Sequence, residues 1–217
     1  MPLRVLFFVL SALAALSACS SDPARTACAT VDWRALGAED GAAGREENAV
    51  KKRLDACEGD KDDADPDLYA AGWAEGLRAY CTPERGFRAG VNNEDYEKVC
   101  KGDGEAAFLA EFEAGQAYFD AVGELVKAAD AAAEARSSLS RHRTAIRSAK
   151  SRHENSYLSG DERYAARLDV EYHEREIQGL LMKLPKLEAK KRETETALKA
   201  MESDLIEKGR LPAPQSN

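Results

Sequence analysis

The chain has 217 residues, a formal net charge of −8 and 32% charged residues, which leaves room for one or two domains. Residues 19–104 hold 12 Lys and Arg against 19 Asp and Glu, a net charge of −7 (12 − 19). This acidic balance excludes nucleic acid and anionic lipid headgroups as partners of the first half, because both require a positive surface.

Residues 1–18 have the pattern of a secretory signal peptide. A positive charge at Arg4 precedes an apolar run, Val5–Leu16, that is too short to span a bilayer stably. The segment Leu16-Ser17-Ala18-Cys19 resembles the bacterial lipoprotein box, which implies that Cys19 is acylated; the alternative is an ordinary signal with an A-x-A-like cleavage site. Ser20 resembles the default outer-membrane sorting signal. Residues 19–27 would then be a lipid anchor and linker on the periplasmic face.

The cysteines beyond Cys19 predict two disulfides, because an even number in an oxidising compartment normally pairs. They are Cys28, Cys57, Cys81 and Cys100. Four cysteines permit three pairings, of which we prefer Cys28–Cys57 with Cys81–Cys100. No C-x-x-C or C-x-x-H pair is present, so a metal site is disfavoured.

Residues 28–116 predict a small helical module rich in Cys and Gly. Gly37, Gly41 and Gly44 share one helical face, and a second helix is expected over Asp67–Tyr80 with Pro66 in its first turn. Its stripe is Tyr69, Gly72, Trp73, Gly76, Leu77 and Tyr80. Glycine destabilises a helix interior, so these faces indicate close helix packing. The alternative is a glycine-walled ligand cleft, lined by Trp33, Tyr69, Trp73 and Tyr80.

The same module resembles a family of small bacterial envelope lipoproteins catalogued only as a domain of unknown function. The resemblance covers about residues 28–118 and is carried by Cys28, Asp32-Trp33, Gly37, Asp40-Gly41, Gly44, Cys57, Tyr69, Gly72, Gly76-Leu77, Tyr80-Cys81-Thr82-Pro83, Gly86, Gly90, Tyr96, Cys100 and Phe108. The family's second glycine pair is replaced here by Val91–Asp95. The resemblance implies an envelope lipoprotein and supplies no catalytic or binding residue.

Residues 117–208 predict a long antiparallel coiled-coil hairpin. The first helix, which the pattern begins near Glu105, has an apolar stripe and a neighbouring stripe that extends the apolar face toward Asn155. They are Phe108, Phe112, Gly115, Phe119, Val122, Val126, Ala129 and Ala133, and Leu125, Ala132, Leu139 and Ile146. The second helix has a heptad seam. It comprises Ile177, Leu180, Leu184, Leu187, Lys191, Thr194, Leu198, Met201 and Leu205.

The ends of the second helix are marked in the sequence. A capping box, Ser159 with Glu162, follows the expected turn at Tyr157–Gly160. Pro185 is expected to kink or break this helix, because proline lacks the backbone N–H. Residues 209–217 are expected to form a disordered tail.

Candidate chemistry outside the disulfides is sparse. Folding the hairpin at its turn sets His142 opposite His173, near Glu171 and Glu174, a minimal set for a metal or a proton sensor. A solvated charged surface is the favoured interpretation. The acidic run Glu58–Asp67 lacks the glycine and the twelfth-position acid of a calcium loop, so it predicts an interhelical loop.

The sequence also lacks the nucleophile elbow, the phosphate loop and the H-E-x-x-H motif. We therefore expect no catalytic residue, no bound metal and no cofactor. The expected protein is all-α: a disulfide-braced module followed by a coiled-coil hairpin, anchored to the outer membrane through Cys19. Its expected role is that of a non-enzymatic scaffold or adaptor for an envelope protein, or a homo-oligomer, with a glycan or small-ligand binding module as the alternative.

Overall fold

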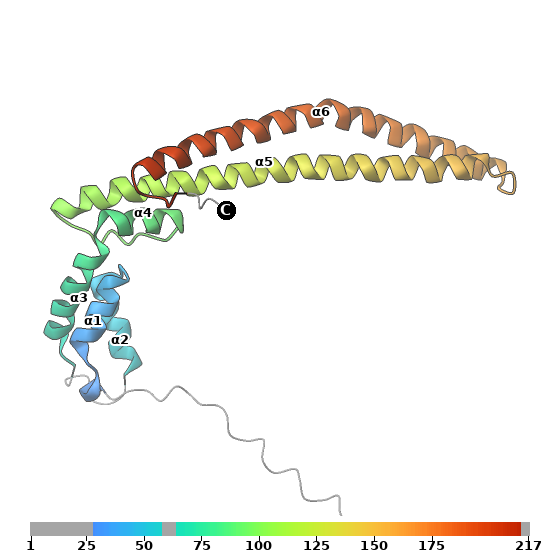
Figure 1. The fold of residues 1–217 in the computed structure, drawn as a ribbon. Coiled ribbons are helices and arrows are strands. Elements are labelled where there is room, and N and C mark those ends of the chain that lie inside the picture. The colour runs from blue at the N-terminus through green and yellow to red at the C-terminus, as the bar shows by residue number, and fades with distance from the viewer. Residues whose placement is uncertain (1–27, 58–63, 214–217) are drawn as a thin grey trace, which may run out of the picture. The chain divides into compact units, whose positions relative to one another are not determined.

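The computed structural model describes residues 28–57 and 64–213, and every regular element in these ranges is helical (Figure 1). This confirms the expected all-α class. The helices are α1 (Trp33–Ala42), α2 (Val50–Ala56), α3 (Pro66–Tyr80), α4 (Pro83–Val91), α5 (Asp103–Glu154) and α6 (Gly160–Glu207), with 3-10 helices η1 (Cys28–Thr30) and η2 (Glu47–Ala49). None of the helices within the described ranges is long and apolar enough to cross a bilayer.

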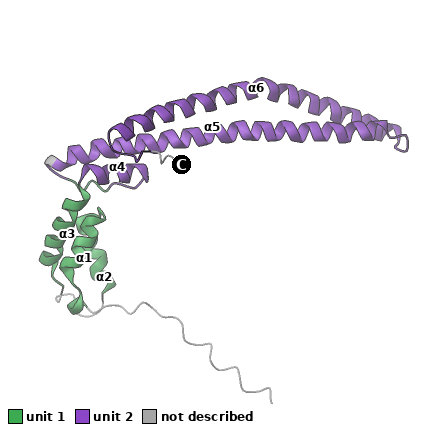
Figure 2. Cartoon of the chain, in the orientation of Figure 1, with its two compact units in different colours: residues 1–81, 97–100 green, residues 82–96, 101–217 purple. Residues whose placement is uncertain are grey.

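The chain divides into two compact units (Figure 2). Unit 1 contains the described residues up to Cys81 together with Glu97–Cys100, and unit 2 contains Thr82–Tyr96 and the described residues from Lys101 onward. The boundary expected between residues 116 and 117 falls inside the continuous helix α5. The change in composition at that point marks where α5 changes its packing partner from α4 to α6, and the backbone does not break there.

Side-chain caps and a glycine set the ends of the unit 1 helices. Asp32 and Asp65 each accept a hydrogen bond at 2.9 Å from the backbone N–H three residues later, the usual N-cap arrangement. Helix α1 ends at Ala42, and Gly44 adopts the left-handed conformation with φ 71°. The expectation that Gly44 extends the helical glycine face is therefore wrong, because it terminates the helix as glycines commonly do.

Helices α1 and α3 pack at backbone distance. A Cβ added at Gly37 would lie 2.0 Å from the carbonyl oxygen of Tyr69, and one at Gly72 would lie 1.9 Å from that of Arg34. Gly41 and Gly76 are equally enclosed, at 2.1 Å and 2.0 Å from backbone oxygens of the facing helix. The close packing predicted from the glycine pattern is confirmed, and no room is left on these faces for a ligand.

In unit 2 the short helix α4 packs on the first turns of α5, again through glycine. A Cβ at Gly90 would lie 2.1 Å from the carbonyl oxygen of Phe112, and one at Gly115 would lie 2.3 Å from that of Phe87. Phe108 is fully buried in the same interface and lies 4.9 Å, centroid to centroid, from the ring of Tyr96. Glycine and aromatic side chains thus anchor α4 against α5.

The rest of α5 pairs with α6 as the predicted hairpin. On α6 the predicted seam is confirmed, because its members are all buried or half-buried. On α5 the seam follows Leu125, Ala132, Leu139 and Ile146, together with Ala135, His142 and Ala149. Phe119 and Val126 are 42% and 52% exposed, so of the two neighbouring stripes only the second forms the seam with α6. The first part of the stripe that contains Phe119 and Val126 packs against α4.

The hairpin turn and the end of α6 are locally determined. The capping box is present, with the Ser159 hydroxyl accepting from the Glu162 N–H and the Glu162 carboxylate accepting from the Ser159 N–H. Helix α6 continues through Pro185 and bends in its middle part (Figure 1). After the end of α6, Arg210 donates from Nε to Glu111 at 2.8 Å. Residues 214–217 lie outside the described residues, and the disorder of the tail stays a prediction.

Candidate functional site

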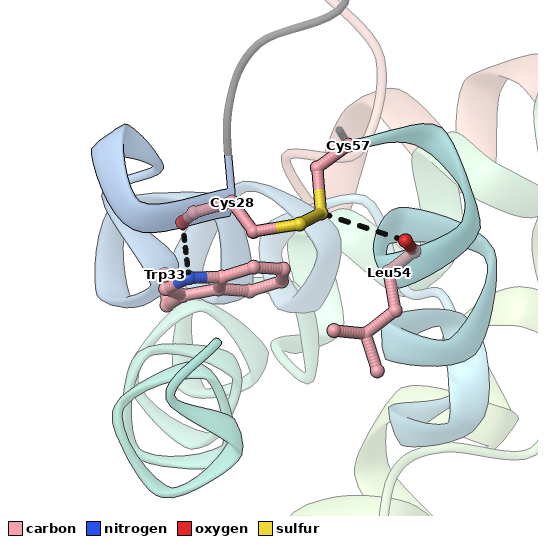
Figure 3. Close-up of a disulfide and its surroundings, with 4 residues drawn as sticks. All are labelled: Cys28, Trp33, Leu54 and Cys57. Carbon is pink, nitrogen blue, oxygen red and sulfur yellow. Dashed lines mark hydrogen bonds between the residues drawn. A yellow bond between two sulfur atoms is a disulfide. The ribbon is translucent and has the colours of Figure 1, made fainter. Parts of the chain in front are cut away.

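The two disulfides are Cys28–Cys57 and Cys81–Cys100, the pairing preferred from the sequence. Figure 3 shows the first of them beside Trp33, whose indole is 3% exposed and donates from Nε1 to the Cys28 carbonyl oxygen at 3.3 Å. The Cys57 sulfur lies 3.4 Å from the Leu54 carbonyl oxygen. A disulfide sulfur has no proton to donate, so this second contact is one of packing. The disulfide and the indole together close one end of the unit 1 core.

The four aromatic residues of the expected ligand cleft are core residues of unit 1. Trp33, Tyr69 and Tyr80 are 3%, 1% and 2% exposed. Trp73 is half-buried, and its indole donates to the Arg45 carbonyl oxygen at 2.8 Å. Because the glycine faces beside them are filled by backbone, these side chains line no cleft between α1 and α3.

The most unusual group in unit 1 is Asp40, a fully buried carboxylate on α1. It receives hydrogen bonds from three side chains that the fold brings together: Arg45 beyond the end of α1, Arg53 on α2 and Tyr69 on α3. The Tyr69 hydroxyl donates to Oδ2 at 2.9 Å, and Arg53 Nε donates to the same oxygen at 3.0 Å. Arg45 and a second Arg53 nitrogen donate to Oδ1.

This network holds its members in one protonation state. Burial acts to raise the pKa of Asp40, but the hydrogen bonds from Arg53, Tyr69 and Arg45 outweigh it, and the pKa lies below its ordinary value. Burial, followed by the hydrogen bond to Asp40, raises the pKa of Tyr69. Asp40 thus stays ionised and Tyr69 stays a neutral phenol. Both Asp40 oxygens accept hydrogen bonds and are shielded from solvent. The cluster therefore ties α1 to α2 and α3, and Asp40 is not available as a general base.

Sequence reasoning missed this cluster, although one signal was present. Asp40 lies on the buried face of α1 directly before Gly41 and three residues after Gly37, and a charged residue among glycines that contact another helix must find buried partners. Which partners it finds depends on Arg53 and Tyr69, 13 and 29 residues away. Local patterning cannot supply that information.

The histidine pair of the hairpin is formed as its register predicts. His142 Nδ1 lies 2.8 Å from His173 Nδ1 within the half-buried seam, so one ring donates an N–H to the unprotonated nitrogen of the other. Glu174 lies 3.8 Å from Lys150, and Glu171 lies 3.8 Å from Arg167. Throughout residues 28–57 and 64–213, no group of three or more His, Cys, Asp or Glu side chains is placed to hold a metal ion.

Other expected sites fall wholly or partly outside the described residues. Cys19 and the signal segment lie in residues 1–27, and most of the acidic run 58–67 lies in residues 58–63. Of that run, Asp65 serves as the N-cap of α3 and Pro66 opens the helix. This agrees with its interpretation as an interhelical loop that leads into a helix N-terminus.

Exposed large apolar side chains are concentrated in the hairpin. Of nine such side chains in the described part of the chain, eight belong to α5, α6 or their connecting turn: Phe119, Val126, Tyr157, Tyr164, Leu168, Tyr172, Leu181 and Met182. On α6, Tyr164, Leu168 and Met182 fall at helical spacing on the side away from the seam. Tyr172 lies at the edge of the seam, with its ring 6.3 Å from that of His142. Apolar surface at that spacing is typical of a face that another helix contacts.

Comparison with known families identifies one domain. Residues 32–117 match the family model DUF2799, described as a protein of unknown function. The match spans most of unit 1, α4 and the part of α5 that packs against α4. It ends near the point where α5 begins to pack against α6. Comparison with curated proteins and with solved structures yields no significant match.

Proposed function

We propose that this protein is a non-enzymatic lipoprotein of the bacterial envelope that serves as a scaffold or adaptor. In this proposal Cys19 is acylated and holds the chain at the periplasmic face of the outer membrane. The hairpin then takes up another envelope protein. Support for the anchor comes from the sequence Leu16-Ser17-Ala18-Cys19, and support for the role comes from the hairpin surface.

The observation that carries the proposal is the apolar surface of the hairpin. A helical pair satisfied by its own seam would present mainly charged residues to solvent, yet Tyr164, Tyr172 and Met182 are 55%, 50% and 72% exposed. The seam is also thin, since Ala132, Ala135 and Ala149 occupy buried positions of α5. A thin seam with apolar outer faces favours a structure that gains a further helix.

The contacts of unit 1 do not favour the alternative, a glycan or small-ligand module. Its aromatic side chains are engaged in the core and its glycine faces touch backbone. Nor do they favour catalysis by Asp40 and Tyr69, whose polar atoms already bond to each other and, for Asp40, to two arginines.

Crosslinking in the native envelope tests the adaptor role. A lysine-reactive reagent acting on the intact chain is expected to trap one recurrent protein. The crosslinked peptides are expected to contain hairpin lysines such as Lys183 and Lys186, in preference to Lys51 and Lys52 of unit 1, all four of which are exposed. A protein that is monomeric after removal of its lipid and that traps no partner would contradict the proposal.

The anchor is tested separately by Cys19→Ala. The unaltered chain is expected in the outer-membrane fraction with a metabolically incorporated fatty acid, because two or more acyl chains hold a protein firmly. The variant is expected in the soluble periplasmic fraction without the label. Retention of the variant in the membrane would show that another segment carries the attachment.

A further inference from the structure

The apolar stripe of α5 that packs against α4 continues beyond the end of that interface. The covered part contains Phe108, Phe112 and Gly115. The part that α4 leaves uncovered, at the same spacing, contains the exposed Phe119, Val126 and Ala133 and the half-buried Val122, Gly123 and Ala129, of which Ala129 borders α6. Residues three and four apart share a helical face, and 14 steps of 1.5 Å give the uncovered part a length of about 21 Å. Beyond it the same face turns polar, with Ser137, Ser140 and Thr144.

Gly123 sits within this uncovered stripe, four residues after Phe119 and three before Val126. At Gly115 and Gly90 the glycine lets α4 and α5 approach to backbone distance. A Cβ at Gly123 would meet nothing within 4 Å. Glycine in a helix interior costs about 1 kcal/mol relative to alanine, and no contact within the described chain requires it here. The stripe therefore repeats the apolar and glycine pattern with which α5 docks α4, and within the described residues no helix packs against Gly123.

The charges beside the stripe indicate which sign of charge a helix would need in order to dock there. Between residues 116 and 134, α5 has four acidic side chains and one basic one: Asp120, Glu124, Asp130 and Glu134 against Lys127. Glu124 is paired with Lys127 and Glu134 with Arg141, so the acidic excess rests on Asp120 and Asp130. The adjoining edge of α6 is balanced, with Lys191 and Lys199 against Glu195 and Glu202. In the covered part of α5, Glu111 already receives the guanidinium of Arg210. Complementarity thus favours a basic occupant.

Two sources within the protein itself are disfavoured as occupants. A second copy that packed antiparallel through the same face, about a two-fold axis across the helices, would place the two acidic rows against each other. The C-terminal segment is held at Glu111 by Arg210, and the four residues after Ala213 include no large apolar side chain.

We propose that residues 119–133 of α5 dock an amphipathic helix of a partner protein, as a continuation of the interface that α4 begins. The partner helix has Gly, Ala or Ser four residues apart on its apolar face, which lets it reach Gly123. It carries Lys or Arg at the edges, opposite Asp120 and Asp130. This inference rests on the proposed adaptor function and names the class of partner and the surface that takes it.

Gly123→Leu tests the surface without endangering the fold. Leucine is a better helix former than glycine, and the position is open, so the hairpin is expected to stay folded. The side chain would block close approach of a docking helix. Gly179→Leu is the matched control, because Gly179 lies inside α6, also has nothing within 4 Å and gains the same helix propensity. Gly179 shares the outer face of α6 with Tyr164 and Met182, so weakening by Gly179→Leu alone would place the docking surface on α6 and overturn the proposal.

The first probe is a synthetic helical peptide of about four turns, with Ala and Gly four residues apart beside Leu and with Lys at the edges; its comparison peptide has Glu in place of Lys. Titration of the delipidated full chain is expected to show saturable binding of the basic peptide, weakened about tenfold or more (about 1.4 kcal/mol) by Gly123→Leu. Gly179→Leu is expected to leave it unchanged. Equal binding to both variants, or equal binding of the two peptides, would overturn the proposal.

A photoreactive residue at position 126 of the full chain, in its native envelope, tests the site in place. Trapping of one protein that is lost with Gly123→Leu and kept with Gly179→Leu supports the inference. If a partner is trapped by the hairpin lysines but Gly123→Leu leaves trapping unchanged, the docking surface is wrong while the adaptor role stands. If no partner is trapped by either route, both fail, and self-crosslinks alone would replace the partner helix by a second copy.

Discussion

Unit 1 and the hairpin use opposite ways to hold helices together. In unit 1, α1 and α3 touch through glycine backbones, with a buried ion cluster and two disulfides beside them. In the hairpin, α5 and α6 touch through a regular but thin seam and leave large apolar side chains exposed. The first arrangement tolerates almost no change, because its neighbours are backbone atoms that cannot move aside. The second tolerates substitutions better and exposes apolar side chains to solvent. The two regions are therefore expected to respond differently to substitution.

The largest expected effect comes from adding one methyl group to the glycine interface. Gly72→Ala places a Cβ against the Arg34 carbonyl oxygen, so α1 and α3 must separate, and we expect a loss of about 4 kcal/mol in the stability of unit 1. Gly179→Ala in the hairpin is the control and should stabilise by about 0.5 to 1 kcal/mol. Both tryptophans lie in unit 1, so urea unfolding followed by tryptophan fluorescence reports on unit 1 selectively, and circular dichroism at 222 nm follows the hairpin variant. Equal effects of the two changes would end the comparison.

Breaking a disulfide is expected to have the next largest effect. Cys81→Ser opens a loop between residues 19 positions apart, and the chain entropy regained by a loop of this length corresponds to about 3 kcal/mol. Unit 1 should become sensitive to protease, while α5 and α6 keep their far-ultraviolet circular dichroism. Undiminished protease resistance of unit 1 would refute the bracing role of this disulfide.

Removing the buried charge of Asp40 should lower the stability of unit 1 by less, because its arginine partners are partly exposed and can be solvated by water. We expect Asp40→Asn to destabilise unit 1 by about 2 kcal/mol at pH 7. The pKa of Asp40 in the fold lies below its ordinary value of 3.8, so its contribution is fully present above that value and is lost as the pH falls through the lower folded pKa. The difference between wild type and variant should thus shrink below about pH 4. Glu39→Gln, at an exposed neighbour, is the control for the loss of one negative charge, and it should change the stability of unit 1 at pH 7 by much less.

The smallest effect concerns the histidine pair in the hairpin. Replacing His142 and His173 together by Leu exchanges a polar contact in the seam for an apolar one and should stabilise the hairpin by about 1 kcal/mol. His173→Leu alone leaves His142 without its partner and should be neutral or destabilising. Thermal unfolding followed at 222 nm measures both. A double variant that melts below the single one would show that the pair contributes net stability.

Features that depend on the residue spacing within a single helix could be predicted from the sequence. The α6 seam, the capping box at Ser159 and the glycine faces of α1 and α3 follow from helical spacing alone. Two features escaped it. Asp40 depends on partners from α2 and α3, and both stripes of α5 have heptad-like spacing, so only the docking of α4 shows which of them faces α6.

Hydroxyl-radical footprinting of the purified, delipidated chain tests the central claim most directly, because tyrosines in both regions give a matched comparison. A closed unit 1 and an open hairpin predict that Tyr69 and Tyr80 are protected while Tyr164 and Tyr172 are modified rapidly, along with Met182. Modification of Tyr69 and Tyr80 at the rate of Tyr172 would show that the glycine-lined faces open to solvent. That result would contradict the account and return the ligand cleft to consideration.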